Sequence, residues 1–287
     1  MKEIAITEYI LPVERSTGAR LVPRPATAEP VTRIPPEAGT RSAPEHVVIM
    51  AGGRGLRLHP HTLTSPKPLV TLDGQPIVEI ILRQLRGFGI THATLCVSHL
   101  ASMIEDFLGE GTHLGLSLDY YVDPDPLGTA GPLAALPDWD APIVVMNADV
   151  LTALNFGDLY STHQDRGAVL TVAAHVTETP ISQGLLALSG DSVQGLWEKP
   201  RLELDVCAGV YVLSPEARAE IPEGRRWDMT DLIQSLLAKG CPVVAHRFTD
   251  AWHDMGTPSG LEQARRSFAE HRSDYLPGLS HATGSRA

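Results

Sequence analysis

Residues 47–69 decide the fold and read Val47-Val48-Ile49-Met50-Ala51-Gly52-Gly53-Arg54-Gly55-Leu56-Arg57-Leu58 and, further on, Ser65-Pro66-Lys67-Pro68-Leu69. The apolar, β-branched run at the start predicts a buried parallel strand. Three glycines follow, and glycine allows φ > 0 and lets a ligand approach bare N–H groups. The cationic side chains of Arg54, Arg57 and Lys67 come next. A strand, a glycine turn and clustered positive charge predict a polyphosphate-binding loop.

This loop is neither of the two best-known phosphate motifs. It lacks the Walker-A pattern G-x-x-x-x-G-K-[ST]. The dinucleotide fingerprint G-x-G-x-x-G also fails, because Leu58 stands where its third glycine is needed. A glycine-rich turn after a strand is common in proteins that bind no phosphate, so the turn alone leaves a purely structural role open.

The full string from Met50 to Leu69 resembles the signature of the sugar-1-phosphate nucleotidylyltransferases, L-A-G-G-x-G-x-R-L-x-P-x-T-x-x-x-P-K-P-L. Met50 replaces the first leucine, and every other fixed position matches. The resemblance extends over about residues 46–268 and is closest to the mannose- and heptose-1-phosphate guanylyltransferase-like branch. It implies that the NTP phosphates are held by Ala51, Gly52, Gly53, Gly55 and Arg57. Arg57 and Lys67 would stabilise transition-state charge, with Lys199 as the third catalytic cation.

The remainder of the chain alternates strands and helices. Strands are expected at about 92–97, 117–122, 143–146 and 168–174, and helices at about 77–88, 100–108 and 156–166. Further strands are expected near 184–189, 193–198, 206–213 and 242–248, and helices near 214–220, 229–239 and from 257. This pattern predicts an α/β fold with a Rossmann-like mixed, mostly parallel sheet flanked by helices. Ligands bind such sheets at the carboxyl ends of the strands.

The domain prediction has three parts. Residues 1–45 are rich in proline and read as a flexible tail, with an interaction segment as the alternative. Residues 46–272 form the nucleotidyltransferase domain, with an NTP-binding half at 46–150 and a sugar-phosphate-binding half at 151–272. Residues 273–287 carry no pattern and are expected to be a flexible C-terminal tail.

Two aspartates are the predicted metal ligands. Transfer of a nucleotidyl group requires negative charge to be neutralised, and Mg²⁺ held by one or two carboxylates is the usual means. Asp149 ends the apolar strand at 143–146, in Asn147-Ala148-Asp149, which resembles the family's N-G-D with an alanine in place of glycine. Asp254 lies in a segment that resembles W-x-D-x-G-T-P. The resemblance implies that Asp149 and Asp254 bind Mg²⁺ together, whereas either alone could simply cap a turn.

Other motifs concern the base and the acceptor. Glu198-Lys199-Pro200 resembles the family's E-K-P, whose residues contact the sugar phosphate and a sugar hydroxyl; a solvated surface pair is the alternative. The segment from Leu127 to Leu133 resembles the loop that lies against the nucleobase, so Gly128 and Thr129 are expected to bind the nucleotide. Its P-L-G-T-A-G form favours GTP.

Two departures from the family pattern concern the acceptor. Cys207 replaces the asparagine of N-A-G-x-Y, and Gln183-Gly184 replaces Y-G. We expect Gly184 and Cys207 to line the acceptor site beside Glu198 and Lys199. Losing the asparagine amide removes a donor and an acceptor, so an acceptor other than a common hexose 1-phosphate is expected. Candidates are a deoxy sugar, a modified heptose or octose, or a cyclitol phosphate.

The composition of the chain limits which partners and which cellular compartment are expected. A formal charge of −11 argues against nucleic acid as a partner, and no apolar run is long enough to span a membrane. Neither a secretory leader nor a disulfide framework is expected, because the N-terminus lacks the pattern of the former and the three cysteines are far apart. A cytoplasmic protein is therefore expected, with a homodimer as the default. None of the histidines has zinc-site spacing.

Two rival functions remain. The first is a CTP-, UTP- or dTTP-using member of the same family. The second is a non-catalytic homologue that binds NDP-sugars and regulates a partner, although such a protein would not need Arg57, Lys67, Asp149, Lys199 and Asp254 together.

Overall fold

The computed structural model describes residues 20–21, 44–53, 55–59, 62–123 and 125–276. Most of the predicted N-terminal tail and Arg54 lie outside the described residues. The chain divides into two compact units. One contains residues 1–39, 174–207 and 247–249, and the other contains 40–173, 208–246 and 250–287. The border between them does not coincide with the predicted boundary after residue 150, because part of the second half belongs to the same unit as the first half.

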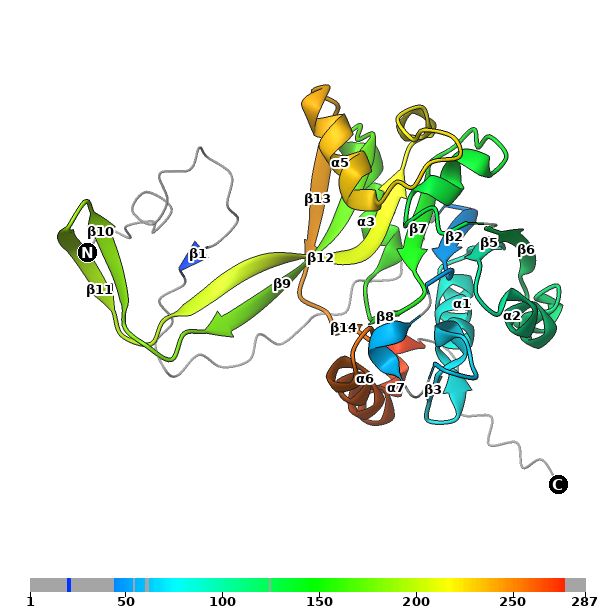
Figure 1. Cartoon of the computed structure of the whole chain (residues 1–287), viewed down its shortest axis with the longest axis horizontal. Coiled ribbons are helices and arrows are strands. Elements are labelled where there is room, and N and C mark those ends of the chain that lie inside the picture. Colours follow the sequence, from blue (N-terminus) through cyan, green and yellow to red (C-terminus); the bar gives the residue numbers. More distant parts are fainter. Residues whose placement is uncertain (1–19, 22–43, 54, 60–61, 124, 277–287) are drawn as a thin grey trace. The chain divides into compact units, whose positions relative to one another are not determined.

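The larger unit is built on parallel strands β2 (His46–Met50), β5 (His92–Val97), β6 (Ser117–Val122) and β7 (Ile143–Asn147), as Figure 1 shows. Strand β2 lies between β5 and β7, and β6 pairs with β5, all in parallel register. The end of β12 (Arg201–Leu213) pairs antiparallel with β7. With β9 (Leu170–Pro180) and β13 (Val243–Phe248), the whole sheet has the order β13-β9-β12-β7-β2-β5-β6, and β1 (Arg20–Leu21) pairs with β12. The predicted α/β fold with a mostly parallel sheet is confirmed.

Helices flank this sheet, and their faces follow the sequence pattern. Helix α1 spans Ile77–Gly87 and buries its whole isoleucine and leucine face. The others are α2 (Ala101–Leu108), α3 (Phe156–Asp165), α4 (Pro215–Arg218), α5 (Met229–Ala238), α6 (Pro258–Glu270) and α7 (Arg272–Tyr275). Helix α4 is shorter than predicted. The segment after the predicted nucleobase loop forms a short 3₁₀ helix, η5 (Gly131–Ala135), whose second residue is Pro132.

Small pairings that carry little sequence signal complete the larger unit. Strand β8 (Val150–Thr152) pairs antiparallel with β14 (Trp252–Asp254), and β3 (Thr71–Leu72) pairs with β4 (Gln75–Pro76). None of these was predicted, because a strand of two or three residues is too short to show a period of two. Short 3₁₀ turns are η2 (Leu56–Leu58), η3 (Lys67–Leu69) and η4 (Thr112–Leu114).

The C-terminal prediction needs a correction. Residues 273–287 were expected to be a flexible tail, but Tyr275 is fully buried at the end of α7. Its ring lies 5.9 Å from that of Phe268 on α6, which is also fully buried. A single aromatic residue after a helix has no periodicity that a sequence pattern could reveal. The prediction for residues 277–287 lies outside the described residues.

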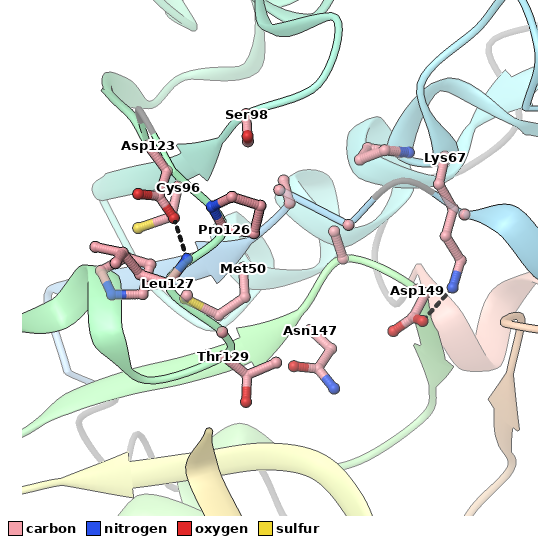
Figure 2. A pocket seen from close by; sticks show the side chains of 18 of the residues that line it. Met50, Lys67, Cys96, Ser98, Asp123, Pro126, Leu127, Thr129, Asn147 and Asp149 are labelled. Atoms are coloured by element: carbon pink, nitrogen blue, oxygen red, sulfur yellow. Dashed lines mark hydrogen bonds and ion pairs between the residues drawn. The ribbon is translucent and has the colours of Figure 1, made fainter. Parts of the chain in front are cut away.

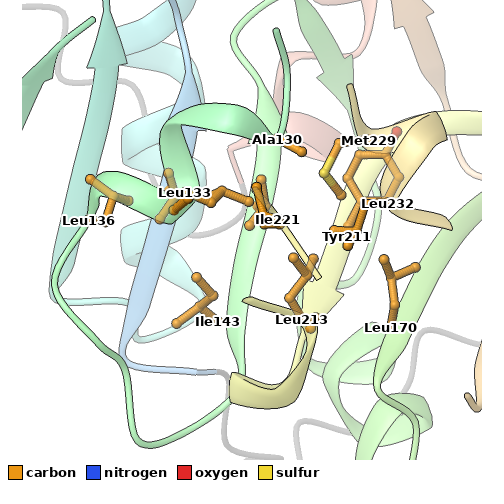
Figure 3. Close-up of a cluster of buried hydrophobic side chains, with 14 of the residues drawn as sticks. Ala130, Leu133, Leu136, Ile143, Leu170, Tyr211, Leu213, Ile221, Met229 and Leu232 are labelled. Atoms are coloured by element: carbon orange, nitrogen blue, oxygen red, sulfur yellow. The ribbon is translucent and has the colours of Figure 1, made fainter. Parts of the chain in front are cut away.

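A hydrophobic cluster fixes the part of this unit that borders the cavity described below (Figure 3). It joins Leu133 of η5 and Leu232 of α5 to the sheet residues Val48, Val145 and Leu213, all fully buried. Burial of apolar area at roughly 25 cal/mol per Å² makes this the main stabilising contribution to the region. The loop before η5 and the start of α5 are therefore attached to one rigid support.

The smaller unit contains long strands and a hairpin. Strands β9 (Leu170–Pro180), β12 and β13 (Val243–Phe248) each continue into it, and β10 (Leu185–Ser189) pairs antiparallel with β11 (Ser192–Trp197). Strand β9 ends later than predicted, at residue 180, and strand β12 begins earlier than predicted, at residue 201. Arg247 forms ion pairs with Glu203 and Asp205 here, at 2.5 and 2.6 Å.

Candidate active site

A cavity of about 550 Å³ opens in the larger unit at the carboxyl ends of β2, β5 and β7. That volume lies within the usual range for small-molecule sites. Its walls include all the predicted nucleotide-binding residues: Ala51, Gly52, Gly53, Gly55, Arg57, Gly128 and Thr129. The predicted residues Lys67 and Asp149 also line it. The structure therefore gathers these predicted residues around one space.

The glycine loop directly follows β2. The Ala51 N–H donates to the Cys96 carbonyl at 2.8 Å, which keeps the loop against β5. Gly55 has φ +61, in the left-handed region that favours glycine, and its carbonyl accepts from Thr62 Oγ1 at 2.7 Å. A Cβ at Gly55 would lie 2.9 Å from Thr62 Cγ2, so glycine is required there sterically as well. By contrast, a Cβ at Gly53 would meet nothing within 4 Å.

Lys67 and Asp149 form an ion pair across the cavity floor (Figure 2). The two side chains are 11% and 24% exposed. Lys67 is held by η3, which follows Pro66, and Asp149 follows the end of β7. Partial burial strengthens this interaction relative to an exposed pair. A cation and a predicted metal ligand thus face each other in the cavity that the glycine loop also lines.

The antiparallel pairing of β8 with β14 brings the two predicted metal ligands together. Asp254 lies opposite Val150, the neighbour of Asp149, and the Met255 N–H donates to the Asp149 carbonyl at 2.9 Å. Asp254 Oδ1 accepts from the Gly256 N–H at 2.7 Å. A Cβ at Gly256 would lie 2.7 Å from Arg57 Nη2, so the guanidinium of Arg57 rests against this turn beside Asp254.

These two carboxylates are the predicted magnesium ligands. Among the described residues, no group of three or more histidine, cysteine, aspartate or glutamate side chains could hold a metal. Mg²⁺ does not need such a group, since it is usually bound by one or two carboxylates and completes its octahedron with water and phosphate oxygens. Asp149 already has a cation as its neighbour, which shows that its environment accepts positive charge. The role of Asp149 and Asp254 as metal ligands stays a prediction.

Figure 2 shows the opposite end of the cavity, where Asp123, Leu127 and Thr129 lie across from Lys67 and Asp149. Leu127 begins a loop that is bonded along its length to the segment before α5. The Trp227 N–H donates to the Leu127 carbonyl at 2.9 Å, and the Trp227 carbonyl accepts from the N–H groups of Ala130 and Gly131, each at 2.9 Å. Two segments about a hundred residues apart therefore form one wall.

Thr129 completes this wall through hydrogen bonds to both Asp228 and Met229. The Thr129 N–H donates to Asp228 Oδ1 at 3.0 Å, and the Met229 N–H donates to Thr129 Oγ1 at 2.9 Å. Gly128 has φ +82, and a Cβ there would lie 2.5 Å from Asp228 Oδ1. Only glycine therefore allows the loop to lie this close to Asp228.

Sequence reasoning missed several residues that line the cavity. They are Met50, Cys96, Ser98, Asp123, Asn147, Arg226 and Asp228. Asn147 was inside a quoted motif but received no role. Asp228 shows a signal, because Asp228 and Asp231 form the capping box that starts α5, yet that pattern indicates a helix start and not a cavity. Burial, followed by the nearby Asp123 carboxylate, raises the pKa of the Cys96 thiol to about 12, so this cysteine is not a nucleophile.

The predicted acceptor-site residues Gly184, Glu198, Lys199 and Cys207 all belong to the smaller unit. A Cβ at Gly184 would lie 3.4 Å from Glu198 Oε2, so these two predicted residues are close together. Lys199 has φ +47, an unusual value for a residue that is not glycine, and its ammonium lies 3.9 Å from Glu198. Strained backbone of this kind is frequent at functional sites. Cys207 is exposed on β12.

Comparison with known proteins agrees with this geometry. A model of the nucleotidyl transferase family matches residues 46–271. The chain is 32% identical to a mannose-1-phosphate guanylyltransferase catalytic subunit beta from Danio rerio, over 74% of this chain and 61% of the relative. It thus spans about three fifths of that relative's length.

The chain covers a larger share of two other relatives. A mannose-1-phosphate guanylyltransferase from Mycobacterium tuberculosis is 31% identical, and a UTP–glucose-1-phosphate uridylyltransferase from Synechocystis is 30% identical, each over 83% of this chain and 67% of the relative. Among solved structures, a putative glucose-1-phosphate thymidylyltransferase from Bacillus anthracis superposes with a TM-score of 0.63 at 21% identity, over 77% of this chain and 94% of that one. HddC from Yersinia pseudotuberculosis gives 0.61 at 23% identity, over 78% of this chain and 99% of that one. These structures share the fold.

Proposed function

Because the chain belongs to the nucleotidyl transferase family, we propose that it couples GTP to a sugar 1-phosphate or a sugar-like cyclitol 1-phosphate. The products are an NDP-sugar or its cyclitol counterpart and pyrophosphate. The observation that carries this proposal is the cavity lined by the glycine loop, Arg57, Lys67 and Asp149, with Asp254 in the turn against which Arg57 rests. We infer that the reaction takes place in the cytoplasm and that the active form is a homodimer, the commonest symmetric assembly.

The proposed reaction is an in-line displacement. An oxygen of the acceptor phosphate forms a bond to the α-phosphorus of GTP, and the bond from that phosphorus to the oxygen bridging to the β-phosphate breaks, which releases pyrophosphate. The N–H groups around Gly52 and Gly53 bind the phosphates, while Arg57 and Lys67 neutralise the charge that develops on them. Lys199 and Glu198 orient the acceptor.

Asp149 and Asp254 would hold Mg²⁺, which supplies further neutralisation of the phosphate charge when bound. Lys67 forms an ion pair with Asp149. Lys67 therefore has two roles in this proposal: it pairs with the Asp149 carboxylate and contacts phosphate oxygens of the nucleotide. No helix within the described part of the chain is long and apolar enough to cross a membrane.

GTP is favoured by two observations. Two of the relatives are guanylyltransferases, although a third is a uridylyltransferase. The loop sequence from Pro126 to Gly131 is the form most typical of guanylyltransferase-like members. The acceptor proposal rests on Cys207, because a sugar hydroxyl left without the family's asparagine would lose roughly 1–3 kcal/mol. We therefore propose a deoxy sugar, a modified heptose or octose, or a cyclitol phosphate.

The test is pyrophosphate release with Mg²⁺. ATP, GTP, CTP, UTP and dTTP would each be combined with hexose, heptose, deoxy-sugar and cyclitol 1-phosphates, with Asp149→Asn as the inactive control. We expect release with GTP and one acceptor class, and slow turnover of glucose and mannose 1-phosphate. Release with UTP or dTTP alone would overturn the choice of nucleotide. Silence across the panel while GTP still binds would overturn the enzymatic proposal in favour of a regulatory protein.

A further inference from the structure

One cation in the cavity wall has no role in the reaction described above. Arg226 lies on the loop before α5 and lines the cavity together with Gly128, Thr129 and Asp228. Its side chain is 70% exposed. Its neighbour Arg225 is also exposed but does not line the cavity. The two arginines are adjacent in sequence, and only the second lies at the site.

The backbone at Arg226 is fixed by its neighbours. Trp227 is bonded to Leu127, Ala130 and Gly131, and Asp228 is bonded to Thr129. Arg226 Nη2 lies 3.3 Å from Asp228 Oδ2, while Asp228 Oδ1 accepts from Thr129. The carboxylate thus connects the guanidinium to the loop. An exposed ion pair of this kind contributes little to stability, but in this structure it places the guanidinium beside Asp228.

The direction of the bound nucleotide follows from the distribution of charge. The triphosphate belongs at the end that contains Lys67 and the glycine loop, with Arg57 beside it. Thr129 lies at the opposite end (Figure 2). A nucleotide that extends between the two ends therefore brings its base to the wall formed by residues 127–129 and 226–228.

We propose that Arg226 reads the nucleobase by donating from its guanidinium to O6 and N7 of guanine, and that Asp228 is the residue that positions it; this rests on the proposed function. Guanine presents two adjacent acceptors on this edge, which match the arginine fork. Adenine has an N6 amino group in place of O6 and would place a donor against a donor. Uracil and thymine offer one acceptor, and cytosine an amino group.

Asp123 is a poorer reader, although it also lines this wall. It is only 7% exposed, and its Oδ2 already accepts from the Leu127 N–H at 3.1 Å. Its Oδ1 is buried, with no hydrogen-bond partner among the described residues. An atom that solvent cannot reach is not available to a base, so Asp123 stabilises the loop whereas Arg226 faces the ligand.

The test compares GTP with 7-deaza-GTP, which lacks the N7 acceptor and is otherwise the same. Binding to the full chain would be measured by calorimetry without an acceptor. We expect the wild type to bind GTP about tenfold more tightly than 7-deaza-GTP and to disfavour ATP. In Arg226→Met the ratio falls to about one, because the variant side chain has no N–H donor for N7. Arg225→Met, the matched control, keeps the wild-type ratio.

Two further variants separate the roles. Arg226→Lys keeps the charge but not the planar fork, and we expect it to lose most of the discrimination. Asp228→Asn keeps a side-chain oxygen that accepts from the Thr129 N–H, but it attracts Arg226 less strongly. The preference for GTP over 7-deaza-GTP should therefore fall, while the midpoint of thermal unfolding changes little. A purely structural role for Asp228 would leave the ratio unchanged.

Each other outcome has a definite meaning. An unchanged ratio in Arg226→Met overturns the proposal, and a simultaneous rise in the KM of the acceptor would place Arg226 at the sugar phosphate. If the wild-type protein binds UTP more tightly than GTP, the proposal that Arg226 recognises guanine is overturned. Pyrophosphate release with UTP would still support nucleotidyl transfer. Discrimination without any pyrophosphate release would do the reverse: it would support Arg226 and contradict the enzymatic proposal.

Discussion

At the scale of single residues, the chemistry of the site depends on a small number of charged side chains. The protein has 23 lysines and arginines against 34 acidic residues. Among these side chains, Lys67 forms an ion pair with Asp149 in the cavity. A cation that pairs with a predicted metal ligand competes with a metal ion for that carboxylate. Lys67 should therefore influence both the reaction and metal binding, in opposite directions.

We expect Lys67→Gln to lower kcat/KM by about 10²–10³-fold, the usual loss when one charge-stabilising donor is removed. The same variant should bind Mn²⁺ more tightly in the absence of nucleotide, because Asp149 loses its competing cation. Pyrophosphate release measures the first effect, and electron paramagnetic resonance of free Mn²⁺ measures the second. Lys239→Gln removes an exposed lysine paired with Glu220 and serves as control. Equal or weaker Mn²⁺ binding in Lys67→Gln would contradict the competition.

At the scale of elements, short pairings fix the site. Strands β8 and β14 contain three residues each, yet their register brings Asp254 beside Asp149. Helix α6 continues directly from this pairing, with the Gly260 N–H bonded to Thr257 Oγ1 at 3.1 Å at its start. Helix α7 then folds back and places Tyr275 against α6. The end of the chain that contains Asp254 is therefore held by more than its own strand.

Tyr275→Ala should destabilise the protein by about 3–5 kcal/mol, the usual range for removing a large buried aromatic side chain. Tyr275→Phe loses only the hydrogen bond to Ser267 and should cost about 1 kcal/mol. Urea unfolding measures both, with Ser273→Ala at an exposed neighbouring position as control. If residues 273–276 were flexible in solution, Tyr275→Ala would unfold at the same urea concentration as the wild type.

At the scale of the whole molecule, buried histidines couple stability to pH. Burial, opposed in part by the charge of Glu216, lowers the pKa of His163 to about 4. The ring is 2% exposed and bonded to Thr171 and Ser214 at 2.9 Å. Burial, reinforced by His92 and opposed by Asp119, likewise lowers the pKa of His46 to about 4. Both histidines are neutral in the folded protein at neutral pH.

The sign of the effect follows from linkage. Between pH 6.5 and about 4 the unfolded chain binds protons at these histidines that the folded chain does not, so the free energy of unfolding rises with pH. For His163 the loss on acidification approaches roughly 3 kcal/mol. We expect His163→Gln to show a shallower dependence across this window than the wild type or His113→Gln, an exposed control. Urea unfolding from pH 7 to 4.5 tests this, and parallel curves for all three proteins would refute it.

The amino-acid sequence by itself determined the longer elements and the local chemistry. The strand ahead of Gly52, the apolar face of α1 and the glycine-rich turn are properties of contiguous residues, so periodicity and residue type are sufficient to predict them. The same holds for the aspartate that follows β7. The loop from Leu127 to Gly131 was also identified, because its composition is local.

Only the tertiary structure decided which of these segments meet. The pairing of Leu127–Gly131 with Trp227–Met229, the contact of Lys67 with Asp149 and the burial of Tyr275 each join residues that are not neighbours in sequence. Arg225 and Arg226 are the same residue type at adjacent positions, and no local pattern distinguishes them. The physical reason is that hydrophobic periodicity reports which face of an element is buried, whereas the partner buried against it is chosen by packing between distant parts of the chain.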